Sequence, residues 1–366
     1  MIQNILPVFN DNYCPLVFSS SEEYVPYLAV ALRSLVENLS EQYNYDIVIM
    51  ENKLSENSRN RLSSLYTREN VSIRFYNLSK VVDENDFCVR GHLAVETFFK
   101  FFIPRIFETY KRVLFVDSDV VFQADPATLY NIDMQGYSLA ASLCCLWNGI
   151  ANTDKNFKRY GIDVLKLSDI NKYFQCGVLL MDIKKLNKEK IYEKCMDKAL
   201  KKMYTCMDQD VFNFVFDGRI CYIDNKWNYE TRQKGFKEEI PNILPEIRKK
   251  YDDAQKSPYI IHYSGKEKPW WYPDEEFADI WWSYARQTPF YELLLERMFN
   301  FKVSEKQKML KTSLINLRNF NRNKFRSLKY KIMSFMTIGK KRQKYKEKYR
   351  KNKQILISTM EFLKNV

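Results

Sequence analysis

The chain has 366 residues, 46% of them apolar, so it can bury the core of an α/β domain of about 250 residues with a segment to spare. Its net charge of +13 comes from the last segment: residues 301–366 hold 20 Lys and Arg against 3 Glu, whereas residues 1–300 have a net charge of −4. This distribution argues against a body that binds nucleic acid through a basic surface. The sequence also lacks any run of about 18 apolar residues, which excludes a transmembrane helix.

Strands alternate with helices through the first third of the chain. Short apolar runs predict strands, and apolar residues at helical spacing predict helices. We expect strands at 15–20, 45–50, 71–78 and 113–116, and helices at 24–39, 55–66 and 92–107. This order predicts βαβ units and a parallel sheet covered by helices on both faces, in which ligands bind at the carboxyl ends of the strands.

The remaining elements suggest two domains. A strand is expected at 176–183, a helix at 207–216, and a strand running into a Gly-containing loop at 259–270. From about residue 290, Lys and Arg mix with Leu, Ile, Phe, Tyr and Met at helical spacing. We therefore predict an α/β domain over residues 1–290 and a basic, aromatic-rich helical tail over residues 291–366.

The eight cysteines show neither a C-x-x-C pair nor zinc-finger spacing, and the first residues do not resemble a signal peptide. We expect free thiols that serve packing in a reducing cytoplasm.

Two carboxylates interrupt the apolar segment "VLFVDSDVVF" (113–122). A buried carboxylate costs several kcal/mol unless a cation or a metal pairs with it. Two interpretations are open at this point. The strand ends in a plain turn, which Asp and Ser favour, or Asp117 and Asp119 hold a divalent metal at the carboxyl end of the strand.

His262 is one of only two histidines in the chain, and a lone strand histidine is more often a hydrogen-bonded core residue. Here it is followed by Gly265 and Lys268. A small residue lets backbone N–H groups approach a phosphate, and a Lys ammonium meets the phosphate charge. Together with Mn²⁺ or Mg²⁺ on the carboxylates, this pattern predicts a diphosphate site. Neither the dinucleotide-binding nor the P-loop glycine motif is present in the sequence.

Six motifs, in this order over roughly residues 13–290, resemble glycosyltransferase family 8, which includes bacterial lipopolysaccharide galactosyl- and glucosyltransferases and glycogenin. They are "VFSSSEEYVPYLAVALRSL", "ETFFKFFIPRIF", "RVLFVDSDVVFQADPATLY", "YFQCGVLLMDIKKL", "MDQDVFN" and "IIHYSGKEKPW". The resemblance implies an α/β GT-A fold, a Rossmann-like mixed sheet flanked by helices, which binds a UDP-sugar and Mn²⁺.

The resemblance also implies roles for individual residues. The metal ligands would be Asp117, Asp119 and His262. Asp208 and Gln209 would be catalytic, with Asp208 orienting the donor sugar and Gln209 near its anomeric carbon. The residues that bind the donor would be Ser19, Ser21, Glu22 and Tyr24 around the uridine, Lys100, Ser118, Gln175 and Cys176 near the sugar and diphosphate, and Gly265 and Lys268 in the phosphate loop.

The implied activity is a retaining transfer of galactose or glucose from a UDP-sugar to a glycan in lipopolysaccharide, lipooligosaccharide or capsule assembly, with Mn²⁺ or else Mg²⁺. A double displacement would need a carboxylate nucleophile where Gln209 stands. Attack on the same face, which we favour, would leave the metal and Lys268 to stabilise the departing UDP. A metal-dependent nucleotide-sugar hydrolase would use the same Asp pair but does not explain "YFQCGV" or "MDQD".

The tail suggests a different partner. A basic stretch that also carries Phe, Leu, Ile and Met fits the surface of an anionic bilayer, and the alternative is a solvated basic helix. A non-enzyme alternative is a basic nucleic-acid-binding protein that uses this tail for phosphate contacts, but the body of the chain carries no recognition motif. We expect a cytoplasmic protein, peripheral at the inner face of the cytoplasmic membrane, with a glycan or lipid-linked oligosaccharide acceptor and no nucleic acid. The aromatic segment 269–282 would cover the donor and shape the acceptor groove, or pack in the core.

Overall fold

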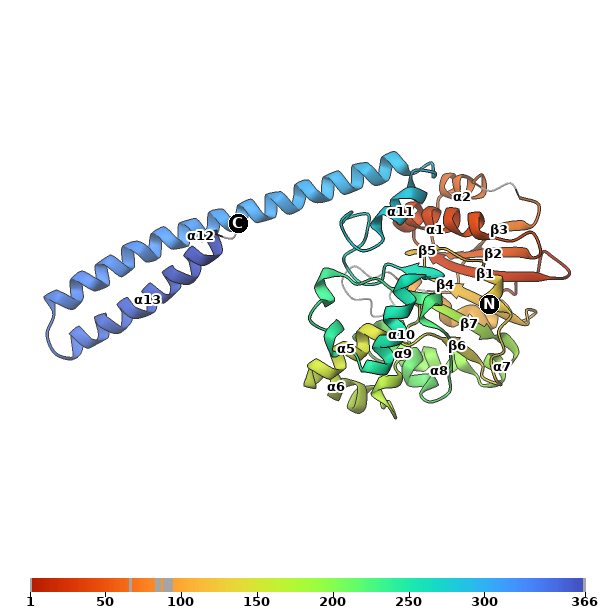
Figure 1. Cartoon of the computed structure of the whole chain (residues 1–366), viewed down its shortest axis with the longest axis horizontal. Helices are drawn as coiled ribbons and strands as arrows, with labels where there is room; N and C mark the ends of the chain where they lie inside the picture. Colours follow the sequence, from red (N-terminus) through yellow and green to blue (C-terminus); the bar gives the residue numbers. More distant parts are fainter. Residues whose placement is uncertain (1, 66–67, 83–86, 88–94, 365–366) are drawn as a thin grey trace. The chain divides into compact units, whose positions relative to one another are not determined.

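The computed structural model describes residues 2–65, 68–82, 87 and 95–364. The chain divides into two compact units, Met1–Leu294 and Leu295–Val366 (Figure 1). The first unit holds two sheets, and the second consists of long helices.

The larger sheet has seven strands in the order β3-β2-β1-β4-β7-β6-β8. They are β1 (Tyr13–Ser20), β2 (Asn44–Glu51), β3 (Val71–Asn77), β4 (Arg112–Val116), β6 (Leu139–Ala141), β7 (Val178–Asp182) and β8 (Cys221–Tyr222). The first four are parallel, as the alternation predicts, but β7 runs antiparallel to both β4 and β6. The parallel pairing expected for the first four strands and the mixed sheet implied by the family resemblance are therefore both confirmed. In this register Val178 pairs with Val116, so the residues just before β7 lie beside Asp117.

The helices of the first unit agree with most of the expected positions. They are α1 (Val25–Asn38), α2 (Glu56–Ser63), α3 (Ile103–Ile106), α4 (Ala127–Tyr130), α5 (Cys145–Thr153), α6 (Lys155–Arg159), α7 (Ile183–Lys188), α8 (Ile191–Ala199), α9 (Met207–Phe216), α10 (Pro245–Lys256) and α11 (Ala278–Ala285). The segment expected as one helix at 92–107 is instead a 3₁₀ helix, η3 (Val95–Phe102), followed by α3. Residues 92–94 and residue 66, which end two of the predicted helices, lie outside the described residues.

A smaller sheet, β5-β10-β9, brings distant segments to the end of β4. Strand β10 (Ile260–His262) pairs antiparallel with β5 (Val120–Phe122) and parallel with β9 (Tyr229–Glu230). His262 lies opposite Val120, and the N–H of Tyr263 donates to the carbonyl of Asp119 at 3.0 Å. This register places the imidazole beside the turn that joins β4 to β5.

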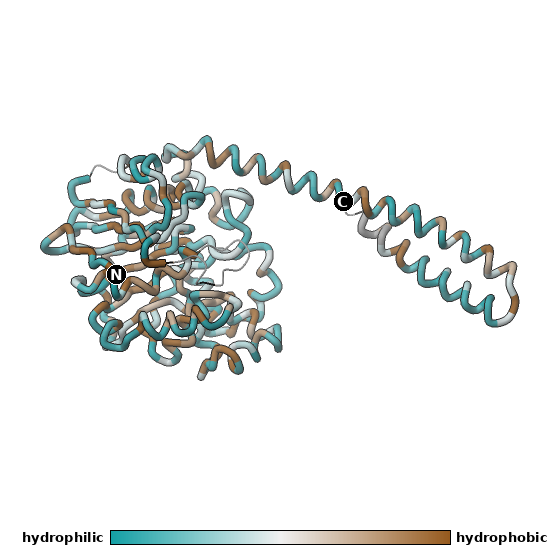
Figure 2. Tube along the Cα trace, turned by 180° about the vertical axis from the view of Figure 1, so that it is seen from behind, coloured by the Kyte–Doolittle hydropathy of each residue, from teal (hydrophilic) through white to brown (hydrophobic). Residues whose placement is uncertain are grey.

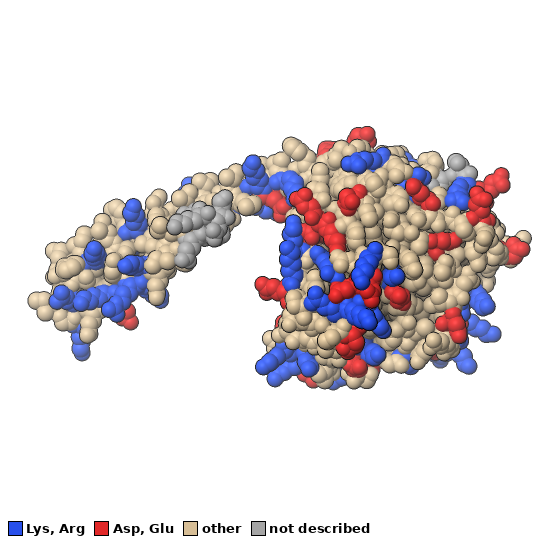
Figure 3. Space-filling model, viewed as in Figure 1, with Lys and Arg blue, Asp and Glu red and all other residues tan. Residues whose placement is uncertain are grey.

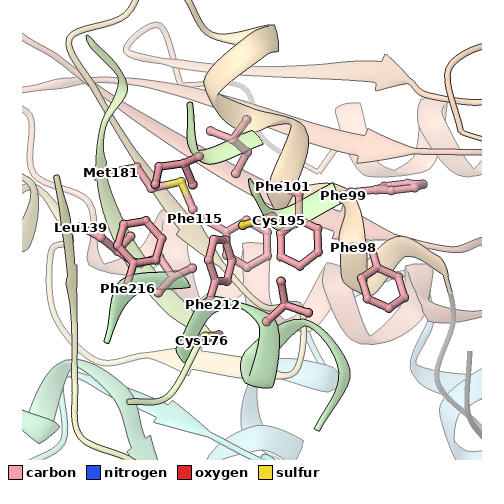
Figure 4. Close-up of a cluster of buried hydrophobic side chains, with 14 of the residues drawn as sticks. Phe98, Phe99, Phe101, Phe115, Leu139, Cys176, Met181, Cys195, Phe212 and Phe216 are labelled. Atoms are coloured by element: carbon pink, nitrogen blue, oxygen red, sulfur yellow. The ribbon is translucent and has the colours of Figure 1, made fainter. Parts of the chain in front are cut away.

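One core cluster joins the larger sheet to the helices that pack on it (Figure 4). Within it, Phe101 of η3 meets Phe212 of α9 edge to face, with ring centroids 4.9 Å apart. Burying a side chain of this kind stabilises the fold by about 1.5–3 kcal/mol. Because Phe99 and Phe101 anchor η3 in this core, the intervening Lys100 is held in a fixed position.

The second unit is a helical hairpin. Helix α12 (Tyr291–Met336), which begins in the first unit, is followed after a short turn by α13 (Lys340–Lys364) (Figure 1). Gly339 in the turn has φ +64°, a conformation that costs glycine little. The rings of Tyr330 and Tyr345 stack across the two helices at 6.2 Å. Within the described residues, every helix is too short or too polar to cross a bilayer.

Candidate active site

Three residues that the sequence predicted as metal ligands converge at the carboxyl end of β4. One ligand atom from each of Asp117, Asp119 and His262 lies within 4.8 Å of the other two. His262 Nε2 is 3.2 Å from Asp119 Oδ1 and 3.9 Å from Asp117 Oδ2. Asp117 and Asp119 do form a turn between β4 and β5, and that turn aims both carboxylates at the imidazole.

Asn228 fixes the orientation of His262. The Nδ2 of Asn228 donates to Gln175 Oε1 at 2.7 Å, so its Oδ1 faces His262 Nδ1 at 2.8 Å and accepts the Nδ1 proton. The other ring nitrogen, Nε2, is thereby left facing the carboxylates. Burial lowers the pKa of His262, but Asp119 and Asp117 raise it more, so the pKa lies above its ordinary value.

The donor set fits a divalent cation. Two carboxylate oxygens and one imidazole nitrogen suit Mn²⁺ and related ions. An imidazole whose second nitrogen is hydrogen-bonded is oriented as metal-binding histidines usually are. The hydrogen bond from Asn228 to Gln175 in turn holds the Asn228 side chain in place. Both of these side chains are almost inaccessible to solvent, so the orientation of the imidazole rests on buried groups.

Gly177 makes room for this histidine. A Cβ on Gly177 would overlap the ring of His262, lying 2.8 Å from its Nδ1, and would sit 2.9 Å from Gln175 Oε1. The backbone of Gly177 also belongs to the site, since its carbonyl accepts from the N–H of Asp117 at 2.8 Å. Glycine is therefore required here by space.

A buried lysine links the metal-ligand candidates to the predicted catalytic pair. Lys100 Nζ is 2.7 Å from Asp208 Oδ2 and 3.2 Å from Asp117 Oδ1, and it donates to the Cys176 carbonyl at 3.1 Å. Burial lowers the pKa of Lys100, but the two carboxylates raise it more, so the ammonium stays charged. The pKa of Asp208 is raised, by burial first and by Asp117 in addition, against the opposing effect of Lys100.

Gln209, the other member of that pair, is held by the backbone of Cys176. Its Oε1 accepts from the Cys176 N–H at 3.1 Å, which leaves a second lone pair on the same oxygen. The thiol of Cys176 itself lies in the core cluster (Figure 4), and burial raises its pKa. Cys176 therefore reaches the site through its peptide group. All seven described cysteines are free thiols.

The predicted phosphate loop lies against the same turn. Lys268 Nζ bonds to Asp119 Oδ2 and donates to the Tyr263 carbonyl at 2.6 Å. Burial raises the pKa of Asp119, but Lys268 and His262 lower it more, so the pKa falls below its ordinary value. Gly265 has φ +81°, and a Cβ there would lie 2.6 Å from Gln233 Oε1, so both conformation and space call for glycine.

The residues predicted to line the uridine differ in what their side chains contact in the structure. Ser118 Oγ donates to the Ser19 carbonyl at 2.7 Å, which ties the Asp117–Asp119 turn to the end of β1. Ser21 precedes a short 3₁₀ helix, η1 (Glu22–Tyr24). The carboxylate of Glu22 accepts from Ser55 and Ser58 at the start of α2, so its oxygens are engaged in the fold.

Tyr24 leads into an aromatic cluster. Its ring lies edge-on to Tyr27 at 5.0 Å and to Trp270 at 6.0 Å, and Tyr27 stacks on Trp270 at 4.1 Å. Trp270 and Trp281 are buried, and Trp282 Nε1 donates to the Pro269 carbonyl at 3.1 Å. These tryptophans of segment 269–282 pack in the core, which was one of the two interpretations left open.

Three residues of the site were not singled out from the sequence: Asn228, Gly177 and Glu230. Glu230 is buried on β9, and its Oε1 accepts from Ser264 Oγ at 3.3 Å and lies 3.7 Å from Cys144 Sγ. Burial raises its pKa. Gly177 lies at the start of a predicted strand, so its position in the sequence could have indicated a role. Nothing in the sequence around Asn228 and Glu230 indicates one, because they reach the site only through the pairing of β9 with β10.

Comparison with known proteins gives a consistent result. The family model "Glycosyl transferase family 8" matches residues 15–273. Glycosyltransferase GlyF of Streptococcus pneumoniae is 25% identical over 305 residues, which cover 81% of this chain and 68% of that protein. The lipopolysaccharide 1,2-glucosyltransferase of Escherichia coli is 23% identical over 279 residues, covering 72% of this chain and 76% of that enzyme.

Solved structures show the same architecture. The bifunctional glycosyltransferase WbbM matches with a TM-score of 0.73 and 27% identity over 81% of this chain, which spans 53% of that protein. Galactosyltransferase LgtC, solved with donor and acceptor sugar analogues, matches with a TM-score of 0.58 and 19% identity over 75% of this chain and 96% of LgtC. The expected GT-A fold is confirmed by these neighbours together with the mixed seven-stranded sheet.

Proposed function

The chain belongs to glycosyl transferase family 8, and on that premise we propose that it transfers galactose or glucose, with retention, from a UDP-sugar to a glycan acceptor. The observation that carries the proposal is the convergence of Asp117, Asp119 and His262 beside the Lys100–Asp208 ion pair. This arrangement offers ligands for a divalent cation and, next to them, a buried carboxylate aligned to accept hydrogen bonds from a sugar.

The proposed cation is Mn²⁺, with Mg²⁺ as the alternative. Asp117, Asp119 and His262 would hold it, and it would supply positive charge to the diphosphate of the bound donor. Lys268, which meets the same carboxylate as His262, would place a second positive charge on the diphosphate. The cation and Lys268 together would therefore stabilise the departing UDP.

Asp208 and Gln209 would act on the sugar. Lys100 holds Asp208 by an ion pair of 2.7 Å, so its carboxylate can orient sugar hydroxyls without free rotation. Gln209 keeps one lone pair of Oε1 available, which favours stabilising positive charge at the anomeric carbon. An amide is a poor nucleophile, so this pair supports attack on the same face over a double displacement.

In that reaction the bond between the anomeric carbon and the diphosphate oxygen breaks, and a bond from an acceptor hydroxyl oxygen to the same carbon forms. The hydroxyl proton passes to the departing diphosphate, so atoms and charge balance without a protein base.

The acceptor we propose is a growing lipopolysaccharide, lipooligosaccharide or capsule glycan. Support comes from the similarity to a lipopolysaccharide glucosyltransferase. We also propose that the tail associates with an anionic membrane at its cytoplasmic face, since 20 of its residues are Lys or Arg and 3 are Glu.

The activity is tested by incubating the protein with UDP-galactose or UDP-glucose and Mn²⁺, with and without oligosaccharide acceptors, and following products by mass. We expect transfer from at least one of these donors, and its loss in the Asp117→Ala, Asp119→Ala and His262→Ala variants. Release of UDP and free hexose at an equal rate with every acceptor would indicate a hydrolase. A preference for GDP- or CMP-linked sugars would overturn the choice of donor.

A further inference from the structure

Apolar residues recur along the length of α12 (Figure 2), and several of the exposed ones form a stripe. Its members recur at intervals of 3, 4, 7 or 8 residues, which keeps them on one side of an α-helix. Each is between 38% and 78% exposed. The stripe consists of Phe299, Val303, Leu310, Leu314, Leu317, Phe325, Leu328, Ile332 and Phe335.

The packing of the hairpin leaves this stripe outside. The positions of α12 that are buried in the second unit are Ser327 and Ser334, and Tyr330 between them stacks on Tyr345 of α13. The side of α12 that is buried in the hairpin therefore carries these two serines and the stacked tyrosine. The Leu, Ile and Phe side chains of the stripe lie on another side of α12 and remain in water.

Basic residues border the stripe along both of its edges. At 100° per residue, Lys311, Arg318, Arg322 and Lys329 fall along one edge, and Lys306, Lys324 and Lys331 fall along the other; all seven are exposed. The sequence contains no Asp or Glu from residue 306 to residue 346. Figure 3 shows Lys and Arg with very little acid on this unit.

We propose that this stripe is the face by which α12 lies in the plane of an anionic bilayer, with its apolar side chains among the acyl chains and the two basic borders at the phosphate level. The inference rests on the membrane association proposed above and adds which face docks and how the helix is oriented. An apolar strip between two rows of Lys and Arg is the pattern of an interfacial helix, because long basic side chains keep their charge at the surface while their stems cover apolar area.

A second copy of the chain fits this face less well. Two such stripes packed together would bring basic borders against basic borders, with no acidic residue on the same stretch to offset the repulsion. An anionic lipid surface offers the opposite charge along both borders at once. Charge complementarity therefore selects the bilayer as the occupant.

Two double variants of the full-length protein test the face. Leu310→Ser with Leu314→Ser removes two apolar side chains from the stripe, whereas Met309→Ser with Ile315→Ser removes two from other sides of the same turns. The four positions are similarly exposed, at 58% and 61% for the stripe pair and 58% and 49% for the control pair. Both variants keep the charge of the tail, and circular dichroism checks that helix content is retained.

Binding is measured by co-sedimentation with vesicles of phosphatidylcholine containing phosphatidylglycerol, and with phosphatidylcholine alone. The stripe variant should lose about tenfold or more in partition coefficient on the anionic vesicles, since each leucine withdrawn from the bilayer forfeits apolar burial. The control variant should bind within about twofold of the wild type. Equal losses in both variants would overturn the proposal.

Sedimentation velocity of the wild type and the stripe variant, without lipid, tests whether a second copy of the chain binds to the stripe instead. Loss of self-association in the stripe variant, with vesicle binding unchanged, would make the face a contact between copies and would also overturn the proposal. Turnover of UDP-galactose and UDP-glucose with Mn²⁺ is followed in all variants. If the wild type turns over neither donor, the proposed activity fails while the vesicle result still decides the docking face.

Discussion

At the scale of single residues, the imidazole of His262 can occupy its position because residue 177 is a glycine. A Cβ on Gly177 would overlap the imidazole, and Asn228 fixes the ring from the opposite nitrogen. The ring therefore has one place to lie, and that place faces Asp117 and Asp119.

Gly177→Ala should consequently weaken Mn²⁺ binding by roughly 10- to 100-fold, the range seen when the support of a metal-binding histidine is removed. Isothermal titration with Mn²⁺ measures the effect. Gly161→Ala is the matched control, because a Cβ at Gly161 would meet its nearest side chains at an ordinary 3.4 Å. Unchanged Mn²⁺ affinity in Gly177→Ala would mean that His262 is not a ligand.

Gln209→Ala should lower kcat by roughly 10²-fold, the order found when one preorganised electrostatic group is removed, and should change the KM for the donor far less. The reason is that the free lone pair on Oε1 is assigned to charge that develops only in the transition state. Steady-state kinetics with both UDP-hexoses separate the two parameters. A raised KM at unchanged kcat would make Gln209 a binding residue instead.

At the scale of elements, the site is assembled by strand pairings that join residues far apart in the sequence. The local pattern was sufficient to predict β1 to β4, α1 and α9, together with the turn at Asp117–Asp119. It could not predict that β7 runs antiparallel or that β10 pairs with β5 and β9, because pairing between segments that are distant in the sequence leaves no local trace. The support of His262 by Asn228 was missed for that reason.

The 3₁₀ helix η1 is anchored to α2 by Glu22, and this contact should be measurable as pH-dependent stability. Burial raises the pKa of Glu22, but hydrogen bonds from Ser58 and Ser55 lower it more, so its pKa lies below the ordinary value. A carboxyl with a lowered pKa stabilises the fold at neutral pH, and that contribution is lost as the pH falls through the lowered value.

Glu22→Ala should therefore reduce the free energy of unfolding by about 1 kcal/mol at pH 7, the net worth of a few partly exposed hydrogen bonds, and by much less at pH 3. Urea denaturation at the two pH values checks this, with the exposed Glu41→Ala as control. A difference between Glu22→Ala and wild type that is the same at both pH values would contradict the role of the ionised carboxylate.

At the scale of the whole molecule, the excess of basic residues and the proposed catalytic residues lie in different units. The proposed catalytic residues all lie within Met1–Leu294, which has its own core, whereas the basic excess lies in residues 301–366. This separation predicts that a chain ending at Asn300 loses binding to anionic vesicles yet still transfers hexose to a soluble acceptor. Vesicle co-sedimentation and a mass-based transfer assay measure the two properties. Undiminished vesicle binding by the shortened chain would show that the first unit, and not the tail, binds the membrane.

The pairing of Lys268 with Asp119 has a thermodynamic consequence for how ligands enter the site. The ammonium and a divalent cation compete for one carboxylate, while a diphosphate gives the ammonium another anion to meet. Diphosphate binding should thus release Asp119 for the cation, and by linkage each ligand raises the affinity of the other by the same factor. We expect Mn²⁺ to bind more tightly in the presence of UDP, and Lys268→Met to tighten the binding of Mn²⁺ alone while shrinking that cooperativity. The enzyme would then assemble its cation and donor together, rather than carry a permanently loaded ion.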